Sequence, residues 1–505
     1  MASPVTVIRN ARVLTLDEVD SDHARSDIVI DSETIVAVGR DAGAAYAGGE
    51  VIEIDASGML AIPGLVNAHL HSPGNFLKAA IPNLPLELFM LYEVPPFMPH
   101  PVSARYAYLR TVWGAVEMLK QGVTAVHDDA FFLPGVTEDE TDSVMAAYTD
   151  SGIRAAVTLD QPNVVEYTKY PFLEGILPAD IRARMDTTTG VPEEELLASY
   201  ADFIGRWGTC HERRVGVAVS CSAPQRVTPS YLQALSELSA RHDIPHNMHI
   251  LETRLQRVFG ETVLGRSLVR YVDELGVLDE RAMVIHAIWI DDDDIELLAA
   301  SGCTVAHNPV SNLKLGSGVM RWRALHDAGV PIALGTDEAT VDDGINVWTV
   351  LKTAGLIHNI SDPDPERWPS ATEILRAATG GGARAMRLGE RTGRLAVGYA
   401  ADIALIDLDS LAFTPLGEIR RQLVYCEPRA AVDTTIVAGE ILMRGGELVG
   451  FDEAVLRAEV RECAAELHSY LEGTRAGVAE LEPYYREMYR RSLAHPIAMS
   501  RWVGS

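Results

Sequence analysis

Long apolar runs, export signals and closely spaced cysteines are all absent from this chain of 505 residues. Its most apolar stretches, residues 283–290 and 330–334, are far shorter than the roughly 20 residues of a membrane-spanning helix. The N-terminal residues alternate as in a strand and lack the basic and then apolar segments of an export signal. The 5 cysteines are widely spaced without a CxxC, which indicates neither a disulfide framework nor a thiolate zinc site. We therefore expect a cytoplasmic protein with no membrane partner.

Positive charge is also scarce. Lysine and arginine number 43 against 71 aspartate and glutamate residues, which gives a formal net charge of −28. Binding to a phosphate backbone depends on lysine and arginine, so this balance argues against nucleic acid as a partner. Apolar side chains make up 47% of the chain, which is enough for a large buried core. The composition favours an acidic globular protein whose copies repel one another.

The two ends of the chain share a β-rich pattern. Residues 5–16 and 27–38 alternate between apolar and polar side chains and are followed by glycines. A similar strand-like pattern returns late in the chain, for example in residues 434–442. Because exposed strand edges must be covered, we predict that residues 1–60 and 390–450 pack together as one composite β-sandwich.

The middle of the chain, residues 61–389, alternates between short apolar runs and longer helical patterns. Eight buried strands with intervening helices are what a (β/α)₈ barrel requires, so we predict an α/β fold with a TIM barrel at its centre. Residues 451–505 are predicted to form a helical tail. The predicted barrel strands cover residues 60–66, 123–126, 155–159, 215–219, 248–251, 283–288, 303–306 and 331–334.

Potential metal ligands follow several of these apolar runs. His69 and His71 stand two residues apart, and alternate side chains of a strand share one face, so both rings can point into the barrel mouth. His249 and His286 each end a predicted strand, and Asp337 follows the last one. Parallel barrels carry their active sites at the carboxyl ends of the strands. The sequence therefore predicts a hydrolase built around one divalent metal ion.

The candidate ligands lie within a set of ordered motifs: PGLVNAHLH (63–71), MHILET (248–253), VIHAIW (284–289), HNPVSNLKLGSG (307–318) and LGTDEA (334–339). These motifs resemble the amidohydrolase superfamily, and specifically its ATZ/TRZ branch of triazine hydrolases and heterocycle deaminases. The resemblance extends over about residues 4–450. It implies a barrel with a composite sandwich and one catalytic metal held by His69, His71, His249 and Asp337.

The resemblance also implies catalytic roles. It assigns Glu252 and His286 to catalysis, beside the ligand Asp337. In such a mechanism Glu252 protonates the ring nitrogen next to the attacked carbon, and His286 stabilises the attacking oxygen. Asp337 accepts the proton of the attacking water.

A single metal ion is expected because of what one segment lacks. Binuclear members of the superfamily need a carboxylated lysine or a glutamate near the end of strand four, and residues 214–226 contain neither lysine nor glutamate. Zn²⁺ is the expected ion. Fe²⁺, Mn²⁺ and Co²⁺ are alternatives, because a set of three histidines and one aspartate suits each of them.

Four further residues are expected to contact the substrate. Many deaminases of the branch carry a histidine close to where Gln225 stands, and glutamine keeps hydrogen-bonding capacity but cannot become cationic. Glu87 occupies the acidic position of the family's substrate loop, and the apolar residues 88–98 suit either a lid over an uncharged ring or a buried packing segment. His307 and Asn312 match a family motif, with packing as the alternative role.

The predicted function is hydrolysis of a non-peptide C–N bond, most simply deamination of an amino-substituted purine, pyrimidine or triazine. Hydrolysis of a urea, carbamate or amide bond and dechlorination at the same centre are the enzymatic alternatives. A catalytically inactive barrel scaffold is the alternative of a different class, and the complete set of ligand residues argues against it. The expected partners are a small-molecule substrate and further copies of the chain in a homo-oligomer, a dimer or higher.

Overall fold

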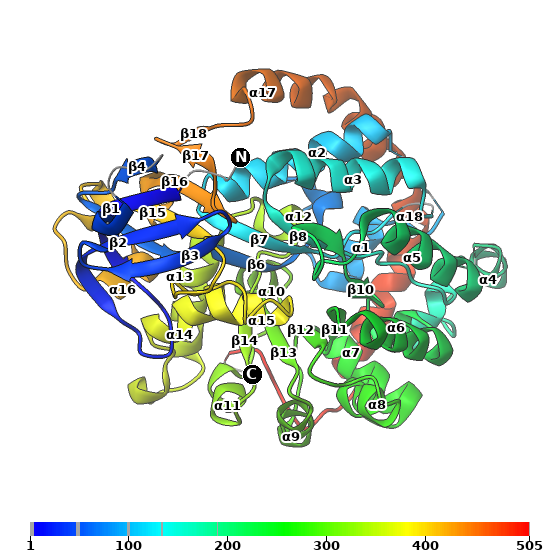
Figure 1. Cartoon of the computed structure of the whole chain (residues 1–505). Coiled ribbons are helices and arrows are strands. Elements are labelled where there is room, and N and C mark those ends of the chain that lie inside the picture. Colours follow the sequence, from blue (N-terminus) through cyan, green and yellow to red (C-terminus); the bar gives the residue numbers. More distant parts are fainter. Residues whose placement is uncertain (1–4, 47–50, 98–101, 133–134, 189, 504–505) are drawn as a thin grey trace.

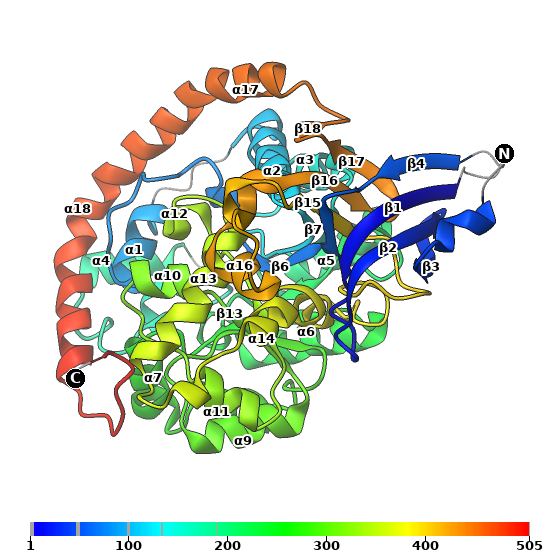
Figure 2. The same ribbon diagram turned by 90° about the vertical axis from the view of Figure 1, so that its left-hand side faces the viewer.

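Parallel strands in the middle of the chain form a barrel, and helices cover the outside of that barrel (Figure 1). A sheet built from both chain ends lies on one side, and the C-terminal helices wrap round the opposite side (Figure 2). The predicted α/β class with a TIM barrel and a helical tail is confirmed. The computed structural model describes residues 5–46, 51–97, 102–132, 135–188 and 190–503.

The barrel strands are short and buried throughout. They are β6 (Leu65–Leu70), β7 (Val123–Asp128), β8 (Arg154–Val157), β9 (Val215–Val217), β10 (Val219–Ser220), β11 (His246–Ile250), β12 (Ala282–His286), β13 (Thr304–His307) and β14 (Ile332–Leu334). Parallel pairing runs from β6 to β9 and from β10 to β14. Only Ala218 separates β9 from β10, so the two serve as one barrel strand, and β14 contacts β6 to close the ring.

Helices follow the barrel strands and bury one face against them. Their ends are capped by short polar side chains: Ser103 accepts a hydrogen bond from the backbone N–H of Tyr106, and Asp291 forms a capping box with Asp294. The longer helices are α1 (Leu86–Glu93), α2 (Ala104–Leu119), α3 (Glu138–Ser151), α4 (Ala179–Asp186), α5 (Glu193–Trp207), α6 (Pro229–His242), α7 (Arg254–Phe259), α8 (Leu268–Glu274), α9 (Asp292–Ser301), α10 (Pro309–Lys314), α11 (Trp322–Asp327), α13 (Val347–Ile357), α14 (Ala371–Arg376) and α16 (Ile419–Tyr425).

One predicted strand is wrong. Residues 60–66 were expected to form a single barrel strand, whereas the structure divides them between β5 (Met59–Pro63) and the barrel strand β6. Proline cannot donate to a strand ladder. Gly64 then passes so close to Thr124 that a Cβ at Gly64 would lie 2.2 Å from the threonine side chain. The chain therefore leaves one sheet and enters the barrel at this Pro-Gly step.

A nine-stranded sheet unites the two chain ends. Its order is β18-β17-β16-β15-β5-β1-β2-β3, with β4 paired to β1. β15 runs antiparallel to β5, with Ile403 opposite Pro63 and Asp407 opposite Met59, so the late strands join the early ones directly. The strands are β1 (Val5–Leu14), β2 (Asp22–Asp31), β3 (Thr34–Gly39), β4 (Val51–Asp55), β15 (Ile403–Asp407), β16 (Val432–Val437), β17 (Glu440–Arg444) and β18 (Glu447–Leu448).

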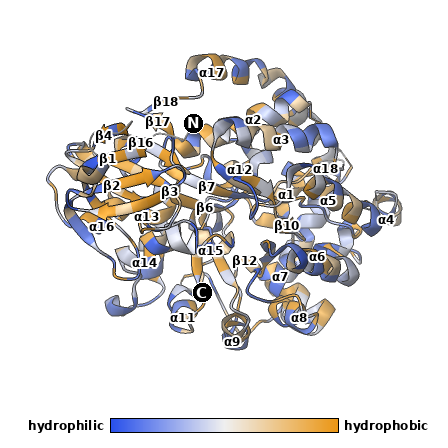
Figure 3. Cartoon of the chain, viewed as in Figure 1, coloured by the Kyte–Doolittle hydropathy of each residue, from blue (hydrophilic) through white to orange (hydrophobic). Residues whose placement is uncertain are grey.

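The strands of this sheet and of the barrel are mostly hydrophobic, whereas the outer helices mix hydrophilic and hydrophobic residues (Figure 3). Inward side chains of the sheet form a core of their own, to which both chain ends contribute, for example Ile8 and Ile28 early and Leu405 and Ile436 late. The barrel and its helices share a second and larger core. Burial of this apolar surface is the main stabilising contribution to both layers.

The C-terminal tail consists of α17 (Glu453–Glu462) and the long helix α18 (Ala464–Ala494), followed by an extended segment. α18 packs against α1 and α7, which both lie near the mouth of the barrel. In the described part of the chain, no helix is long and apolar enough to cross a membrane.

A buried ion pair fastens the barrel to the sheet. Arg154 begins β8, and its Nη2 lies 3.2 Å from Oδ1 of Asp402, whose side chain is fully buried. Asp402 also accepts hydrogen bonds from Thr392 Oγ1 at 2.6 Å and from the backbone N–H of Ala438 at 2.7 Å. Both oxygens of the carboxylate therefore accept hydrogen bonds.

We expect Asp402→Ala to lower the free energy of unfolding by about 3–5 kcal/mol, because the Arg154 guanidinium would stay buried without its counter-charge. Chemical denaturation followed by circular dichroism measures this loss. Asp409→Ala, at an exposed position seven residues further on, is the control and should change stability by less than about 0.5 kcal/mol. Equal stability of the two variants would contradict the role given to Asp402.

Candidate metal centre and active site

The side chains expected to bind metal come together at the carboxyl edge of the barrel. His69 lies near the end of β6 and His71 directly after it, and His249 lies near the end of β11. Asp337 follows β14, and its backbone N–H donates to the carbonyl of His69 over 2.9 Å. Residues from 69 to 337 thus meet at one edge because parallel strands all end there.

The ligand atoms lie within a few ångströms of one another. Nε2 of His249 is 3.2 Å from Nε2 of His69 and 3.3 Å from Nε2 of His71. Oδ1 of Asp337 lies 3.6 Å from His69 Nε2 and 3.7 Å from His71 Nε2. Zinc–nitrogen bonds of 2.0–2.1 Å in a tetrahedron place ligand atoms about 3.3 Å apart. The three imidazole nitrogens therefore have the spacing of metal ligands, and Asp337, which groups by distance with His69 and His286, approaches two of these rings.

Backbone carbonyls fix the ring tautomers. Nδ1 of His71 lies 2.6 Å from the carbonyl oxygen of Asp129, and Nδ1 of His249 lies 2.7 Å from that of Ser222. A carbonyl only accepts hydrogen bonds, so each Nδ1 carries the proton and each Nε2 presents a lone pair. Lone pairs and a carboxylate oxygen that face one another in a buried site repel unless a cation lies between them. The residues present fit a divalent metal ion.

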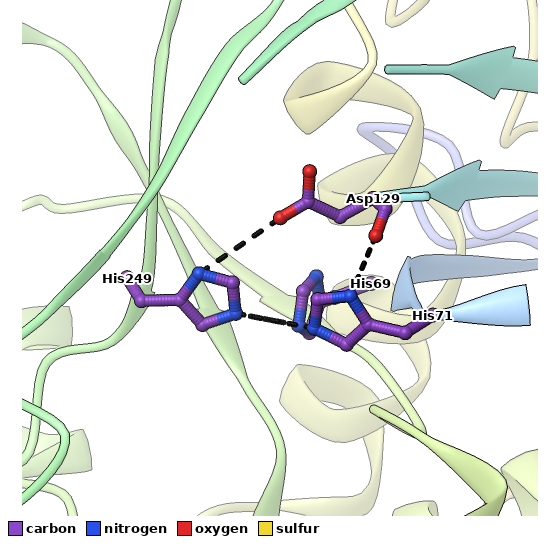
Figure 4. A group of neighbouring side chains, drawn as sticks. All are labelled: His69, His71, Asp129 and His249. Atoms are coloured by element: carbon purple, nitrogen blue, oxygen red, sulfur yellow. Dashed lines mark hydrogen bonds and ion pairs between the residues drawn. The ribbon is translucent and has the colours of Figure 1, made fainter. Parts of the chain in front are cut away.

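Asp129 is a second carboxylate near the same histidines. It groups with His69, His71 and His249 by distance alone. Figure 4 shows, however, that it approaches the other side of the rings, with its carboxylate 3.8 Å from Nδ1 of His249. Thr158 donates to its Oδ1 over 2.6 Å. We therefore place Asp337 with the ligand atoms and Asp129 behind them, where it orients the histidines, as partners of metal-ligating imidazoles commonly do.

Left-handed backbone conformations recur at the site. The φ angles are 63° at Ser222, 52° at Leu251, 73° at His286 and 61° at Asp337. Residues other than glycine seldom adopt this conformation, and such strain tends to gather at functional sites. Each of these residues lies at, or within three residues of, the end of a barrel strand.

Glu252 and His286 adjoin the ligand set. Nε2 of His286 lies 3.6 Å from Oε2 of Glu252 and 3.7 Å from Oδ2 of Asp337. Burial lowers the pKa of His286 to about 4, so its imidazole is neutral. Burial, followed by the charges of Asp337 and Glu87, raises the pKa of Glu252 well above its ordinary value. Glu252 and Asp337, which can both exchange protons, thus lie close to His286, which can also do so.

Asn312, which was expected to contact the substrate, contacts His286 in this structure. Its Oδ1 lies 2.9 Å from Nδ1 of His286, which orients the ring. His307, predicted with it, points elsewhere: its Nε2 lies 3.3 Å from Nε2 of His358, and its ring packs against Trp322. His307 does not line the catalytic cavity, so the geometry favours its packing alternative.

Glu87 and Gln225 also lie beside the cavity and not in its lining. Glu87 is buried and accepts a hydrogen bond from Thr253, the residue after Glu252, over 2.5 Å. Gln225 stands next to the residue that does reach the cavity, Arg226. The lid expected over residues 88–98 is in part present, because α1 contributes apolar residues to the lining and also packs against α18.

Several polar residues of the cavity were not identified from the sequence. Asp160 follows β8, and burial together with the nearby charge of Asp129 raises its pKa to about 7. The other three lie next to or within segments that the sequence had already singled out. Arg226 adjoins Gln225, Glu338 directly follows Asp337, and Glu93 lies in the segment discussed as a lid. The full lining is His71, Leu86, Phe89, Met90, Glu93, Phe131, Asp160, Arg226, His249, Glu252, Gln256, His286, Leu315, Asp337, Glu338 and Val341.

The C-terminal segment straps the loops behind His286. Arg501 donates from Nε to the carbonyl of Ile288 over 3.0 Å, just after β12. Trp502 packs edge-on against Trp289 with ring centroids 5.0 Å apart, and its Nε1 donates to the carbonyl of Gly316 over 2.8 Å. Gly316 follows α10, the helix that carries Asn312. The strap therefore holds both partners of the His286–Asn312 hydrogen bond.

The chain is similar in sequence to one protein family and to individual proteins of known activity. The model of the Amidohydrolase family matches residues 60–442. A 5-methylthioadenosine/S-adenosylhomocysteine deaminase of Desulforudis audaxviator strain MP104C is 30% identical over 462 residues, covering 91% of this chain and 98% of the relative. A 5′-deoxyadenosine deaminase of Methanosarcina mazei is 28% identical, covering 91% and 98%.

Solved structures of similar fold include a deaminase and a chlorohydrolase. An adenosine deaminase from Xanthomonas campestris with bound zinc superposes with a TM-score of 0.79 at 26% identity, covering 92% of this chain and 98% of that one. An atrazine chlorohydrolase from Arthrobacter aurescens TC1, complexed with zinc, superposes with a TM-score of 0.79 at 25% identity, covering 90% and 99%.

We expect metal-replete protein to hold about one equivalent of metal per chain, and His69→Ala to hold less than about a tenth of that, because one of four ligands is lost. Elemental analysis after gel filtration measures both. His326→Ala, on a half-exposed surface histidine, should keep the full equivalent. Two tightly bound ions per chain, or full occupancy in His69→Ala, would refute this assignment.

We also expect Arg501→Ala and Trp502→Ala to lower kcat by about tenfold without loss of metal, because small displacements of catalytic groups are costly. Steady-state kinetics together with elemental analysis test this. Val503→Ala, at the exposed neighbouring position, is the control. A normal kcat in both strap variants would show that the segment does not position His286.

Proposed function

The chain belongs to the amidohydrolase family, and from this premise we propose that it is a mononuclear metal-dependent hydrolase that deaminates an amino-substituted nitrogen heterocycle. The observation that carries the proposal is the meeting of three imidazole nitrogens and one carboxylate oxygen beside Glu252 and His286. Zinc is the metal we propose, because the Xanthomonas and Arthrobacter structures both contain it.

The proposed chemistry divides the work among a few residues. A divalent metal held by His69, His71, His249 and Asp337 would lower the pKa of a bound water to about 7. Oδ2 of Asp337 and the neutral Nε2 of His286 face the same point, so they can take and hold the proton of the attacking water. Glu252, whose pKa is raised by burial, can carry a proton at neutral pH.

Glu252 is best placed to act on the substrate. In the proposed reaction its Oε atom protonates the ring nitrogen next to the attacked carbon. One proton of the attacking water then restores Glu252, and the other passes through Asp337 to the leaving ammonia. Gln256 supports this position, because its Oε1 accepts the backbone N–H of Glu252 over 2.8 Å. Asn312 keeps the His286 ring aligned throughout.

Deamination is favoured over the other hydrolytic reactions because the two curated relatives described above are deaminases of adenosine derivatives. Dechlorination is the second candidate, because the Arthrobacter chlorohydrolase shares the fold over nearly its full length. Either reaction attacks an sp² carbon flanked by nitrogen, so the same residues would serve both. The homo-oligomeric state expected from the sequence stays a prediction.

We expect Glu252→Gln to retain about one equivalent of metal and to lose at least about a hundredfold in kcat, because the amide cannot transfer a proton. Ammonia release from purine, pyrimidine and triazine panels, with chloride release from chlorotriazines in parallel, measures the loss. Glu237→Gln, an exposed change on α6, is the control and should keep normal turnover.

A near-normal rate for Glu252→Gln would remove this residue from the mechanism. If the metal-replete protein released neither ammonia nor chloride from any member of the panels, the proposed reaction itself would be refuted.

A further inference from the structure

Arg226 lines the catalytic cavity but takes no part in the chemistry proposed above. Among the described residues, it contributes the single arginine or lysine side chain to a lining that also contains five carboxyl groups. No carboxylate in the described part of the chain lies within 4.0 Å of its guanidinium. A half-buried guanidinium of this kind loses hydration without gaining a close ion pair. Its place in the cavity wall therefore calls for a functional explanation.

The main chain and one side-chain nitrogen hold Arg226 in place. It ends the short helix η4 (Pro224–Arg226), where its backbone N–H donates to the carbonyl of Ala223 over 2.9 Å and its carbonyl accepts from the N–H of Asn163 over 3.1 Å. In the side chain, Nη1 donates to Oγ of Ser222 over 3.3 Å. Nε and Nη2 have no acceptor among the residues that the structure describes, and both remain accessible to solvent. Their N–H groups can therefore donate to a molecule in the cavity.

The rest of the lining limits what Arg226 can bind. A substrate with a full negative charge would meet the excess of acidic groups in the same cavity, whereas a carbonyl oxygen has no net charge and still accepts hydrogen bonds. Apolar side chains of the lining, among them Leu86, Phe89 and Phe131, suit a flat uncharged ring. A guanidinium presents its N–H groups side by side in one plane, which matches a carbonyl oxygen and a neighbouring ring nitrogen.

Glu252 determines which ring position faces Arg226. Both residues line the cavity, and burial raises the pKa of Glu252 while the charge of Arg226 acts in the opposite direction, so the two groups interact across the cavity. In the proposed reaction Glu252 protonates the ring nitrogen next to the attacked carbon. A substituent on the carbon at the other side of that nitrogen therefore lies on the Glu252 side of the ring, towards Arg226.

Resting on the proposed deamination, we propose that Arg226 is a specificity residue that binds an oxo group on the carbon at the far side of this ring nitrogen. The substrate class is then an amino-oxo heterocycle, in which the oxo carbon, the ring nitrogen and the amino-bearing carbon follow one another. Hydrogen bonds from a charged donor are stronger than those between neutral groups. Because the carbonyl is conjugated with the attacked carbon through the nitrogen, these bonds also make that carbon more electrophilic. Both KM and kcat for such substrates therefore depend on Arg226.

A supporting role makes a different prediction. Arg226 contacts Ser222, whose carbonyl oxygen lies 2.7 Å from Nδ1 of the proposed metal ligand His249. If Arg226 only supported this segment, its replacement would lower the metal content or would slow all substrates alike. If Arg226 binds the oxo group, its replacement acts on oxo substrates selectively and leaves the metal in place.

The test compares matched pairs that differ by one oxo group: cytosine with 4-aminopyrimidine, isoguanine with adenine, and 5-azacytosine with 2-amino-1,3,5-triazine. The carbonyl also alters the intrinsic reactivity of the ring, so the measured quantity is the change in the ratio of kcat/KM values between enzyme variants. For at least one pair, Arg226→Met should lower this ratio by about ten- to a hundredfold, while kcat/KM for the member without the oxo group changes by less than about threefold.

Two further variants and elemental analysis accompany this comparison. Arg226→Lys keeps the charge without the planar arrangement of N–H groups and should recover only part of the ratio. Arg241→Met, the same change at an exposed arginine of α6, should leave both values and the metal content unchanged. An unchanged ratio for every pair in Arg226→Met, or loss of metal from both Arg226 variants, would overturn the role given to Arg226.

Binding is measured separately so that failure of the reaction and failure of the subsite can be distinguished. Isothermal titration calorimetry uses metal-loaded Glu252→Gln protein, with and without Arg226→Met, and the same six compounds. Tighter binding of an oxo compound that is lost with Arg226→Met supports the subsite even if no ammonia is released. Equal affinity within every pair, absence of binding by all six compounds, or a parallel loss for both members would overturn it. Tighter binding of 4-aminopyrimidine-2-carboxylate than of cytosine would also overturn it, because Arg226 would then select an anion.

Discussion

Three imidazole nitrogens and a carboxylate oxygen that meet at the mouth of a barrel are the constraint on which the rest of the site depends. Imidazole nitrogens 3.2–3.3 Å apart, with a carboxylate oxygen within 3.7 Å of two of them, repel one another in a dry interior without a cation between them. Backbone carbonyls, left-handed turns and the buried Asp129 keep these groups in place. The arrangement is stable only when a cation from outside the chain lies between the groups.

The scaffold explains how such an arrangement is stable. His69 and His249 lie in short buried strands, and His71 and Asp337 follow such strands closely, so the neighbouring ladders fix the main chain around the whole set. The sheet of the two chain ends is fastened to the barrel through Arg154 and Asp402, and the C-terminal strap holds the loops behind His286 from the opposite side. Rigidity around the centre lets the site maintain strained turns and repelling groups.

Much of this could be predicted from the sequence, and the failures have physical causes. The positions His69, His71, His249, His286 and Asp337 were visible because each follows an apolar run, and parallel strands bring such positions together whatever their separation in the chain. The division of residues 60–66 was missed because both halves are equally apolar, and only the packing of Gly64 on Thr124 distinguishes them. His307 was expected to contact the substrate or to pack, and this stays a prediction; its ring lies beside His358, which is distant in the sequence, and outside the cavity lining. Arg226, Asp160, Glu93 and Glu338 lie within, or one residue from, segments already singled out, and no periodicity shows which of two neighbours faces a cavity.

The cavity gathers carboxylates that stand in different surroundings. Asp337 faces histidine rings at the proposed metal end. Glu93 and Glu338 lie at the end of α1 and share the hydroxyl of Thr340, which lies 3.3 Å from Glu93 Oε1 and 2.7 Å from Glu338 Oε2. Within the described residues, the lining contains one arginine or lysine side chain, that of Arg226. Acidic groups thus outnumber these basic ones around the centre, and a bound divalent cation would offset part of that excess, which links the composition of the cavity wall to the metal that the residues at its base fit.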